Sequence, residues 1–179
     1  QNIKTKFSQS ALLLRIVSVM VLLSAALSVN AHAASSTSTM NVSVSVEHSC
    51  SVEASPMAFG AYNGVVENAA IALEATATLE TTCTSGAGAL VTINSGASAG
   101  SGSAAEPVRR MTAGEGQYLS YQVYSDVARG TVWGNTASTG VAFTGTGVPQ
   151  ILSAYGSVLA AQPAALGVYS DQLVVTITY

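Results

Sequence analysis

Few side chains of this 179-residue chain could do chemistry, and its two cysteines are the most informative of them. Cys50 and Cys83 are the only cysteines, and His48 lies two positions before the first. A histidine beside a cysteine can begin a zinc site, but such a site needs three or four protein ligands. No further cluster of cysteine and histidine follows. The sequence therefore predicts neither a bound metal nor a cofactor.

The sequence also offers few residues that could catalyse hydrolysis. Beyond residue 33, His48 is the sole histidine, so a Ser-His-Asp triad would need it together with Asp126 or Asp171. No serine lies in a nucleophile-elbow sequence, and the carboxylates are scattered singly rather than paired for glycoside hydrolysis. The glycine-rich stretch 96–102 lacks the Gly-Lys-Ser/Thr ending of a phosphate-binding loop. We expect an exposed His48 in a turn and a protein that is not an enzyme.

The first 33 residues have the three-part pattern of a secretory signal peptide. Basic residues precede an apolar run over 16–29, and an Ala-x-Ala site ends at Ala33. That run is 14 residues long, whereas crossing a bilayer takes roughly twenty. We therefore expect cleavage after Ala33, export, and a mature chain of residues 34–179 without a membrane span.

Charge argues against a nucleic-acid partner. Lys4, Lys6 and Arg15 belong to the predicted leader. Three arginines and nine acidic residues remain beyond it, a formal charge of −6, and no lysine is among them. Binding to phosphates requires a concentrated basic surface, which this composition does not provide.

The cysteines also constrain the expected fold, because an even pair of cysteines in an exported protein is typical of a disulfide. Closing a loop of this length with a Cys50–Cys83 bond stabilises a fold by roughly 3 to 4 kcal/mol in the chain-entropy model. The mature chain has the length of one domain. We expect a single domain held by one disulfide.

Strand patterns dominate the mature chain. Four apolar residues, Met40, Val42, Val44 and Val46, alternate with polar ones, a period of two that puts them on one face of an extended segment. Segment 69–81 contains good helix formers but also alternates, which favours a strand. The further expected strands are 71–80, 89–93, 118–124, 131–133, 148–152 and 172–179. Turns are expected at 62–64, 84–88, 94–105 (a surface hairpin loop) and 140–147, which together predict a β-sandwich.

Two motifs resemble a known family. The stretch 121–134, YQVYSDVARGTVWG, is similar to the Tyr-x-Leu/Val-Tyr-x-Asp-x-Ala-Arg-x-x-x-Trp-Gly stretch of the spore coat protein U domain. The end of the chain, 167–179, resembles the Gly-x-Tyr-x-Asp-x-Leu-x-Val-Thr-Ile/Val-x-Tyr/Phe ending of the same family, and the cysteine spacing fits as well. That family includes major pilin subunits of archaic, Csu-type chaperone-usher pili. The matching positions of the first motif are Tyr121, Tyr124, Asp126, Arg129, Trp133 and Gly134.

The resemblance implies an incomplete immunoglobulin-like β-sandwich that a donor strand from a neighbouring subunit completes. A periplasmic chaperone would fill the open groove first, and at an outer-membrane usher the N-terminal extension of the next subunit would replace it. Residues 34–47 would be this extension, with Met40, Val42, Val44 and Val46 pointing inward, and residues 48–179 would be the pilin domain. Leu173, Val175, Ile177 and Tyr179 would line the groove and contact the chaperone.

The function implied is that of a shaft subunit of a surface pilus that supports adhesion and biofilm formation. Its partners would be copies of itself, other pilus subunits, the chaperone and the usher. Three alternatives stay open from the residues alone. In the first, residues 40–46 form the first strand of their own domain's sheet. In the second, the chain is a self-contained secreted carbohydrate-binding or adhesion domain. The third is an eight-stranded outer-membrane barrel, which would need strands of about ten residues with aromatic girdles, whereas these runs are shorter and aromatic residues are few.

Overall fold

The computed structural model describes residues 33–114 and 116–179. The chain divides between Val44 and Ser45 into two units. In the first, residues 33–44 are extended and exposed, without strand or helix. The predicted signal peptide, residues 1–33, lies outside the described residues apart from Ala33, and its cleavage stays a prediction.

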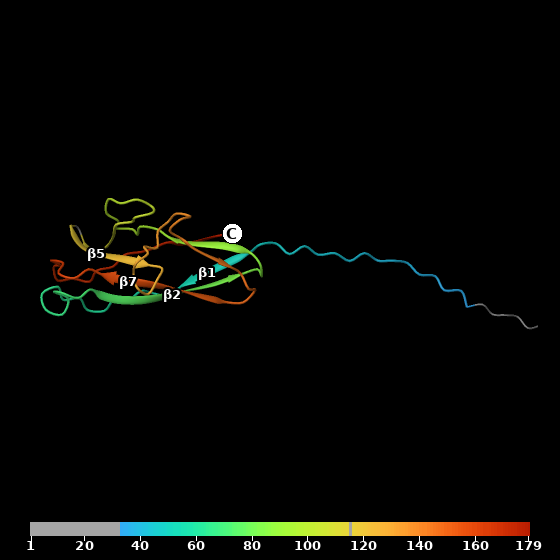
Figure 1. Ribbon diagram of the computed structural model, residues 1–179, viewed down its shortest axis with the longest axis horizontal. Helices are drawn as coiled ribbons and strands as arrows, with labels where there is room; N and C mark the ends of the chain where they lie inside the picture. The colour runs from blue at the N-terminus through green and yellow to red at the C-terminus, as the bar shows by residue number, and fades with distance from the viewer. Residues whose placement is uncertain (1–32, 115) are drawn as a thin grey trace, which may run out of the picture. The chain divides into compact units, whose positions relative to one another are not determined.

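The second unit is a sandwich of two antiparallel sheets (Figure 1). A five-stranded sheet has the order β1-β2-β7-β5-β4, and a three-stranded sheet has the order β6-β3-β8. All regular secondary structure in the described part of the chain is β, which confirms the expected fold class. Accordingly, no described helix could cross a membrane. The strands are β1 (Cys50–Ala54), β2 (Leu73–Cys83), β3 (Gly88–Ile93), β4 (Arg109–Gly114), β5 (Gln117–Tyr124), β6 (Val141–Thr144), β7 (Gln150–Val158) and β8 (Val175–Thr178).

Strand β2 shows why the sequence folds this way. Ala77, Leu79, Thr81 and Cys83 are buried, while the residues between them face outward. Alternate side chains of a strand point to opposite faces, so β2 presents one apolar face to the other sheet. The main core between the sheets consists of Ala77, Leu79, Val91, Ile93, Leu119, Tyr121, Val123, Trp133, Ala154 and Val158.

Three sequence expectations are wrong. Segment 131–133 is not a strand; only an isolated bridge joins Val132 to Tyr124, because a turn built on Asp126 holds the preceding residues. The expected turn 140–147 contains β6, a four-residue strand whose flanking glycines hide its alternation. The loop 94–105 is not a hairpin loop, since it leads from β3 in one sheet to β4 in the other.

Besides β6, two further strands, β1 and β4, were not expected. β1 is a short edge strand with one half-buried apolar residue, Val52, which is too little for a clear alternation. β4 begins with Arg109, a charged residue that is nevertheless only 1% exposed. A charge on the inner face breaks the apolar pattern that signals a strand.

Candidate functional site: an open groove between two sheet edges

The candidate site lies between two strands that each have one unpaired edge. Among the described strands, β1 pairs with β2 and β8 pairs with β3, so both lie at sheet edges. They approach each other without forming a ladder. A cavity of about 400 Å³ opens between them, lined by Val52 and Ala54 of β1 and by residues 172–175 at the entry of β8.

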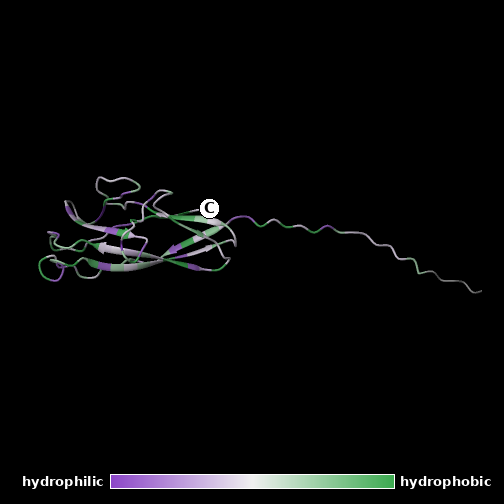
Figure 2. Cartoon of the chain, viewed as in Figure 1, coloured by the Kyte–Doolittle hydropathy of each residue, from purple (hydrophilic) through white to green (hydrophobic). Residues whose placement is uncertain are grey.

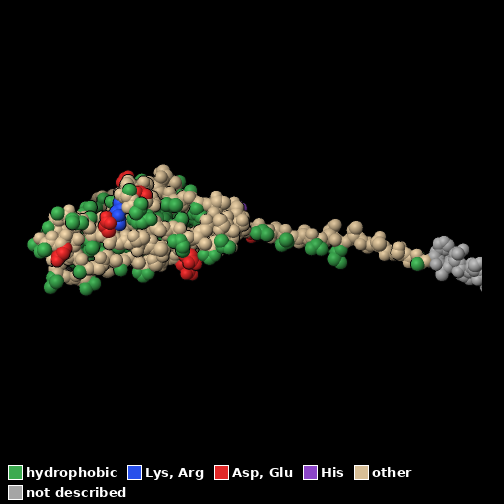
Figure 3. All heavy atoms as spheres, turned by 60° about the horizontal axis from the view of Figure 1, so that its bottom comes forward, with side chains coloured by type: hydrophobic (Ala, Val, Ile, Leu, Met, Phe, Trp, Pro, Cys, Tyr) green, Lys and Arg blue, Asp and Glu red, His purple; other side chains and the backbone are tan. Residues whose placement is uncertain are grey.

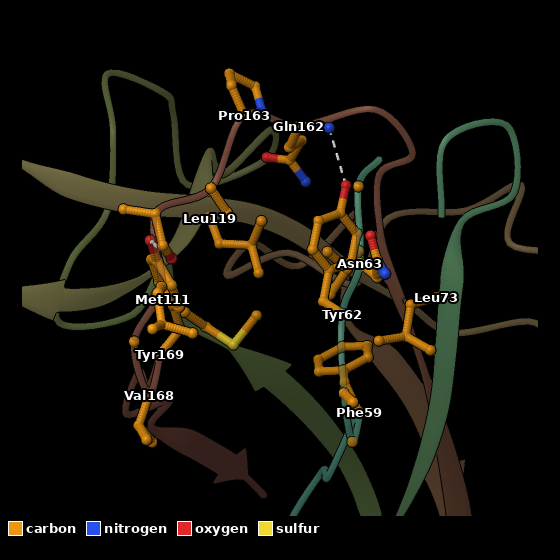
Figure 4. Close-up of a pocket in the computed structure, with 18 of the residues that line it drawn as sticks. Phe59, Tyr62, Asn63, Leu73, Met111, Leu119, Gln162, Pro163, Val168 and Tyr169 are labelled. Atoms are coloured by element: carbon orange, nitrogen blue, oxygen red, sulfur yellow. Dashed lines mark hydrogen bonds between the residues drawn. The ribbon is translucent and has the colours of Figure 1, made fainter. Parts of the chain in front are cut away.

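A second cavity of about 880 Å³ is bounded by the chain segments that extend from these two strands (Figure 4). Its floor is the inner face of the five-stranded sheet, with Leu73, Met111, Leu119 and Val158 from β2, β4, β5 and β7. One wall is segment 57–65, which follows β1, and the other is segment 162–169, which precedes β8. Because the walls of the larger cavity are the chain segments that continue from β1 and lead into β8, the two strands beside the smaller cavity, we treat the two cavities as one feature and call it the acceptor groove.

Hydrogen bonds hold the walls of the acceptor groove in place. The Tyr62 hydroxyl donates to the Leu159 carbonyl at 2.9 Å and accepts from the Gln162 amide at 2.9 Å, the bond drawn in Figure 4. The Ala161 amide donates to the Asn68 carbonyl at 2.8 Å. The groove is therefore a preformed feature of the fold rather than a gap between loose loops.

A glycine allows one wall to approach the floor. A Cβ at Gly156 on β7 would contact the Met57 sulfur and lie 2.7 Å from Cζ of Phe59. Phe59 in turn packs edge-on against the buried Tyr121, with ring centroids 6.0 Å apart. Gly156 thus lets Met57 and Phe59 lie directly on the sheet and line an apolar surface.

Asp171 fixes the entry of the β8 wall. Its carboxylate accepts a hydrogen bond from the Tyr121 hydroxyl at 2.7 Å and from the amides of Ala97 and Ser98 at 2.9 and 3.1 Å. Burial, together with this hydrogen bond to Asp171, raises the pKa of Tyr121, so the hydroxyl stays a donor. The wall is tied in this way to both the core and the loop after β3.

The residues predicted to line the groove differ in position. Leu173 and Val175 line the smaller cavity. Ile177 is half-buried and packs against both core clusters, and Tyr179 is 55% exposed. The larger cavity was not foreseen, because loop residues form its walls. The alternation of Met57 and Phe59 about Ala58 is the sequence signal that could have indicated one of these walls.

The four predicted donor residues are among the most exposed large apolar side chains of the protein. Met40, Val42, Val44 and Val46 are 87%, 88%, 89% and 78% exposed, and residues 33–49 form no strand. Figure 2 shows green, hydrophobic stretches interspersed with paler ones along the extended N-terminal segment. Soluble proteins seldom expose so many apolar side chains together unless a partner covers them.

The disulfide between Cys50 and Cys83 is confirmed. The two cysteines are register partners at the start of β1 and the end of β2. Because β1 has only one strand neighbour, this bond anchors an edge that forms one side of the acceptor groove. His48, just before it, is exposed as expected. No group of three or more metal-ligating side chains is found in residues 33–114 and 116–179.

The residues of the first motif build a turn after β5. The Asp126 carboxylate accepts hydrogen bonds from the amides of Gly130 at 3.1 Å and Thr131 at 2.7 Å. These bonds, that from Gly130 first, lower the pKa of Asp126. Arg129 has a positive φ of 55° and its guanidinium lies 3.0 Å from the Glu74 carboxylate on β2. The Arg129–Glu74 ion pair therefore fastens the turn after β5 to β2.

The end of the motif enters the core. Trp133 is fully buried and its indole N–H donates to the Val91 carbonyl at 2.8 Å, joining the two sheets. A Cβ at Gly134 would lie 2.8 Å from the carbonyl oxygens of Ala104 and Ala105. Only glycine tolerates such close backbone, which explains the residue type. Tyr124, on the opposite face of β5, is half-exposed.

Comparison with known proteins identifies the family of this chain. The family model described as Spore Coat Protein U domain matches residues 36–176. The chain belongs to the spore coat protein U domain family. Protein U of Myxococcus xanthus is 42% identical over 125 residues, which are 68% of this chain and 70% of that protein. The resemblance expected from the two motifs is confirmed.

A solved structure has the same fold. It is described as the CsuC-CsuE chaperone-tip adhesion subunit pre-assembly complex from archaic chaperone-usher Csu pili of Acinetobacter baumannii. The match has a TM-score of 0.55 and 17% identity, and covers 75% of this chain but 40% of the other. This chain thus corresponds to less than half of that protein.

In this member of the spore coat protein U family, one arginine is buried, which the sequence analysis did not predict. Arg109 donates to the carbonyls of Ile93, Asn94 and Trp133 at 2.7 to 3.0 Å and to the Gln122 side chain at 2.6 Å. Burial lowers its pKa to about 10, so it stays charged at neutral pH. It binds together strands of both sheets. No pattern around Arg109 distinguishes it from a surface residue.

The neighbouring arginine has a different role. Arg110 donates to the carbonyls of Ser98 and Ala99 at 3.1 and 2.9 Å. Its guanidinium carbon lies 4.0 Å from the centroid of the Tyr118 ring, a cation–π geometry. Arg110 therefore pins the loop after β3 against β4 and β5.

Proposed function

We propose that this chain is a subunit of a chaperone-usher surface pilus and polymerises by donor-strand exchange. Residues 34–47 are the donor extension, and residues 48–179 form the acceptor domain. The observation that carries the proposal is the acceptor groove, which opens between the unpaired edges of β1 and β8 and includes the apolar cavity over the inner face of the five-stranded sheet. The chain also contains a segment of matching chemistry in Met40, Val42, Val44 and Val46, which are exposed in a single copy.

The physics of the joint is strand addition. A strand inserted beside β8 would hydrogen-bond with its free edge, while alternate side chains enter the groove and set the register. The four donor residues extend over about 20 Å in β geometry, at roughly 3.3 Å per residue. Three of them are valines, which lose little rotamer freedom on insertion because they are β-branched.

The chaperone and the usher follow from the same groove. An unpaired sheet edge beside an apolar trough promotes aggregation, so the subunit needs a cover while it crosses the periplasm. The fold shared with a chaperone–subunit complex supports this role. We place the assembled protein in the pilus shaft at the cell surface, where it supports adhesion and biofilm formation.

The test is an unboiled SDS gel of fibres sheared from cells that produce the chain with its chaperone and usher. We expect a ladder of multiples that collapses to monomer on boiling and is absent when residues 38–47 are deleted. Co-purification of the deleted chain with the chaperone shows that its acceptor domain still folds. A stable monomer from the intact chain, with no ladder, contradicts the proposal and favours a self-contained secreted binding domain.

A further inference from the structure

A threonine just after β2 holds the residues from which the proposed donor extension starts. The Thr84 hydroxyl donates to the Glu47 carbonyl at 3.1 Å and accepts from the Ser49 amide at 3.2 Å. The Thr84 amide donates to the Ser49 carbonyl at 2.9 Å, which continues the pairing of β1 with β2 by one residue. Residues 47–49 are therefore attached to the end of β2, although they precede the first strand.

Hydrogen bonds rather than apolar packing hold this short stretch. Glu47, His48 and Ser49 are all exposed. In Figure 3 the end of the sandwich where β1 begins is mostly tan, the colour of the backbone and of side chains that are neither hydrophobic nor charged. The position of residues 47–49 thus depends on Thr84, and the hydroxyl is the group that reaches as far as Glu47.

Thr84 itself lies on a braced part of the domain. Its neighbour Cys83 forms the disulfide with Cys50, and the Cys83 carbonyl accepts from the Gly147 amide at 3.0 Å. A Cβ at Gly145 would lie 2.5 Å from the Thr84 carbonyl oxygen, so glycine at this position lets the turn after β6 close on the end of β2. The hydroxyl that holds the extension is therefore fixed relative to both sheets.

The held backbone ends next to the last of the four donor residues. Val46 directly precedes Glu47, so their Cα atoms are about 3.8 Å apart. A flexible linker of several residues would let the two joined domains reorient freely. Here no unheld residue separates the side chain that would enter a neighbour's groove from the residue that Thr84 binds. The direction in which the donor strand leaves its own domain is consequently set by this contact.

We propose that Thr84 is a positioning residue that fixes the angle between a subunit and the neighbour that receives its donor strand, and thereby determines the stiffness of the fibre. The inference rests on the proposed donor-strand assembly. The restraint lies within one copy and needs no further contact between domains. Without the hydroxyl, the Ser49 carbonyl stays bound to the amide of residue 84, whereas Glu47 is released and residues 47–48 become a hinge.

The bending of assembled fibres tests the role of the hydroxyl. Thr84→Val removes the hydroxyl at nearly constant size, and Thr84→Ser retains it. The matched control is Thr146→Val, which removes a hydroxyl that donates to the Val148 carbonyl at 3.3 Å in the adjacent turn. Fibres are produced with the chaperone and usher and examined on an unboiled gel for the ladder. Their persistence length is then measured by negative-stain electron microscopy.

We expect the persistence length of Thr84→Val fibres to fall to about half of the wild-type value or less, because hydrogen bonds of modest net strength hold the joint. Thr84→Ser and Thr146→Val fibres should match wild type, and every variant should form the ladder.

Unchanged stiffness of Thr84→Val fibres would overturn the proposal, as would equal softening by Thr84→Ser or by Thr146→Val. In each of these cases the ladder shows that donor-strand assembly stands. Loss of the ladder from Thr84→Val alone would assign the hydroxyl to folding or to strand insertion, which also overturns the proposed role. Wild-type material with no ladder overturns both proposals together.

Discussion

Two segments of this protein have the same alternating sequence pattern and different surroundings. Along residues 40–46 the apolar side chains are 78–89% exposed, and the segment has no strand partner. At the other end of the chain, Leu173, Val175 and Ile177 are half-buried and β8 pairs with β3. The difference teaches that alternation specifies an extended segment with one apolar face, whereas the partner that covers this face is specified elsewhere.

We expect the largest effect from a substitution that prevents the first segment from entering the proposed groove. Val44→Asp places a charge in an apolar groove, where burial of an unpaired charge is strongly unfavourable, so the ladder of multiples is lost. Ser43→Asp is the matched control, because its side chain faces away from the groove and the ladder should persist. Equal ladders from both variants would show that residues 40–46 do not alternate into a groove.

The second effect acts on the edge that borders the groove. Replacing both cysteines with serine, Cys50→Ser with Cys83→Ser, removes a bond that spans 33 positions. The chain-entropy model then predicts a loss of roughly 3 to 4 kcal/mol in the free energy of unfolding. Denaturant unfolding of fibres made from the double variant and from wild type measures it. Coincident unfolding midpoints would mean that β1 does not depend on the disulfide.

A smaller effect contrasts the two segments directly. Ile177→Ala deletes part of a half-buried side chain that packs on both core clusters, and such truncations cost about 2 kcal/mol at the lower end of their range. Val44→Ala, in a side chain 89% exposed, should leave the unfolding of the chaperone-released monomer unchanged. Thermal unfolding of both variants tests this. Similar losses would show that Val44 already packs within its own copy.

We expect the smallest effect from Asp126, which lies outside both segments. Amide hydrogen bonds, first from Gly130, lower the pKa of Asp126 below the ordinary value of an aspartate in the unfolded chain. Its carboxylate therefore contributes stability above the pKa of the unfolded state, and the contribution disappears as pH falls through the lowered pKa of the folded state. Asp126→Asn should melt earlier than wild type at pH 7 and converge with it in acid. Glu67→Gln controls for the loss of charge, and a difference that persists in acid would assign the effect to packing.

The sequence predicted most of the strands because apolar alternation indicates a face that must be buried. β2, β3, β5 and β8 fall on such segments, whereas β7 begins within the expected segment 148–152 but continues to Val158. It could not predict β4, where the buried Arg109 satisfies its charge through carbonyls distant in sequence. For the site, Leu173 and Val175 were found by periodicity, whereas the larger cavity was missed. Loops joined by Tyr62 form its walls, and no local pattern specifies that contact.

The arginines also determine how susceptible the domain is to trypsin-like proteases. Residues 34–179 contain no lysine, and their three arginines are Arg109, Arg110 and Arg129. The first is buried, the second is pinned by Ser98 and Ala99, and the third pairs with Glu74. A trypsin-like protease needs an accessible basic side chain on a locally open backbone. Cleavage by such enzymes therefore requires the domain to unfold first. This resistance to proteolysis comes from the small number of arginines and from the contacts that hold them.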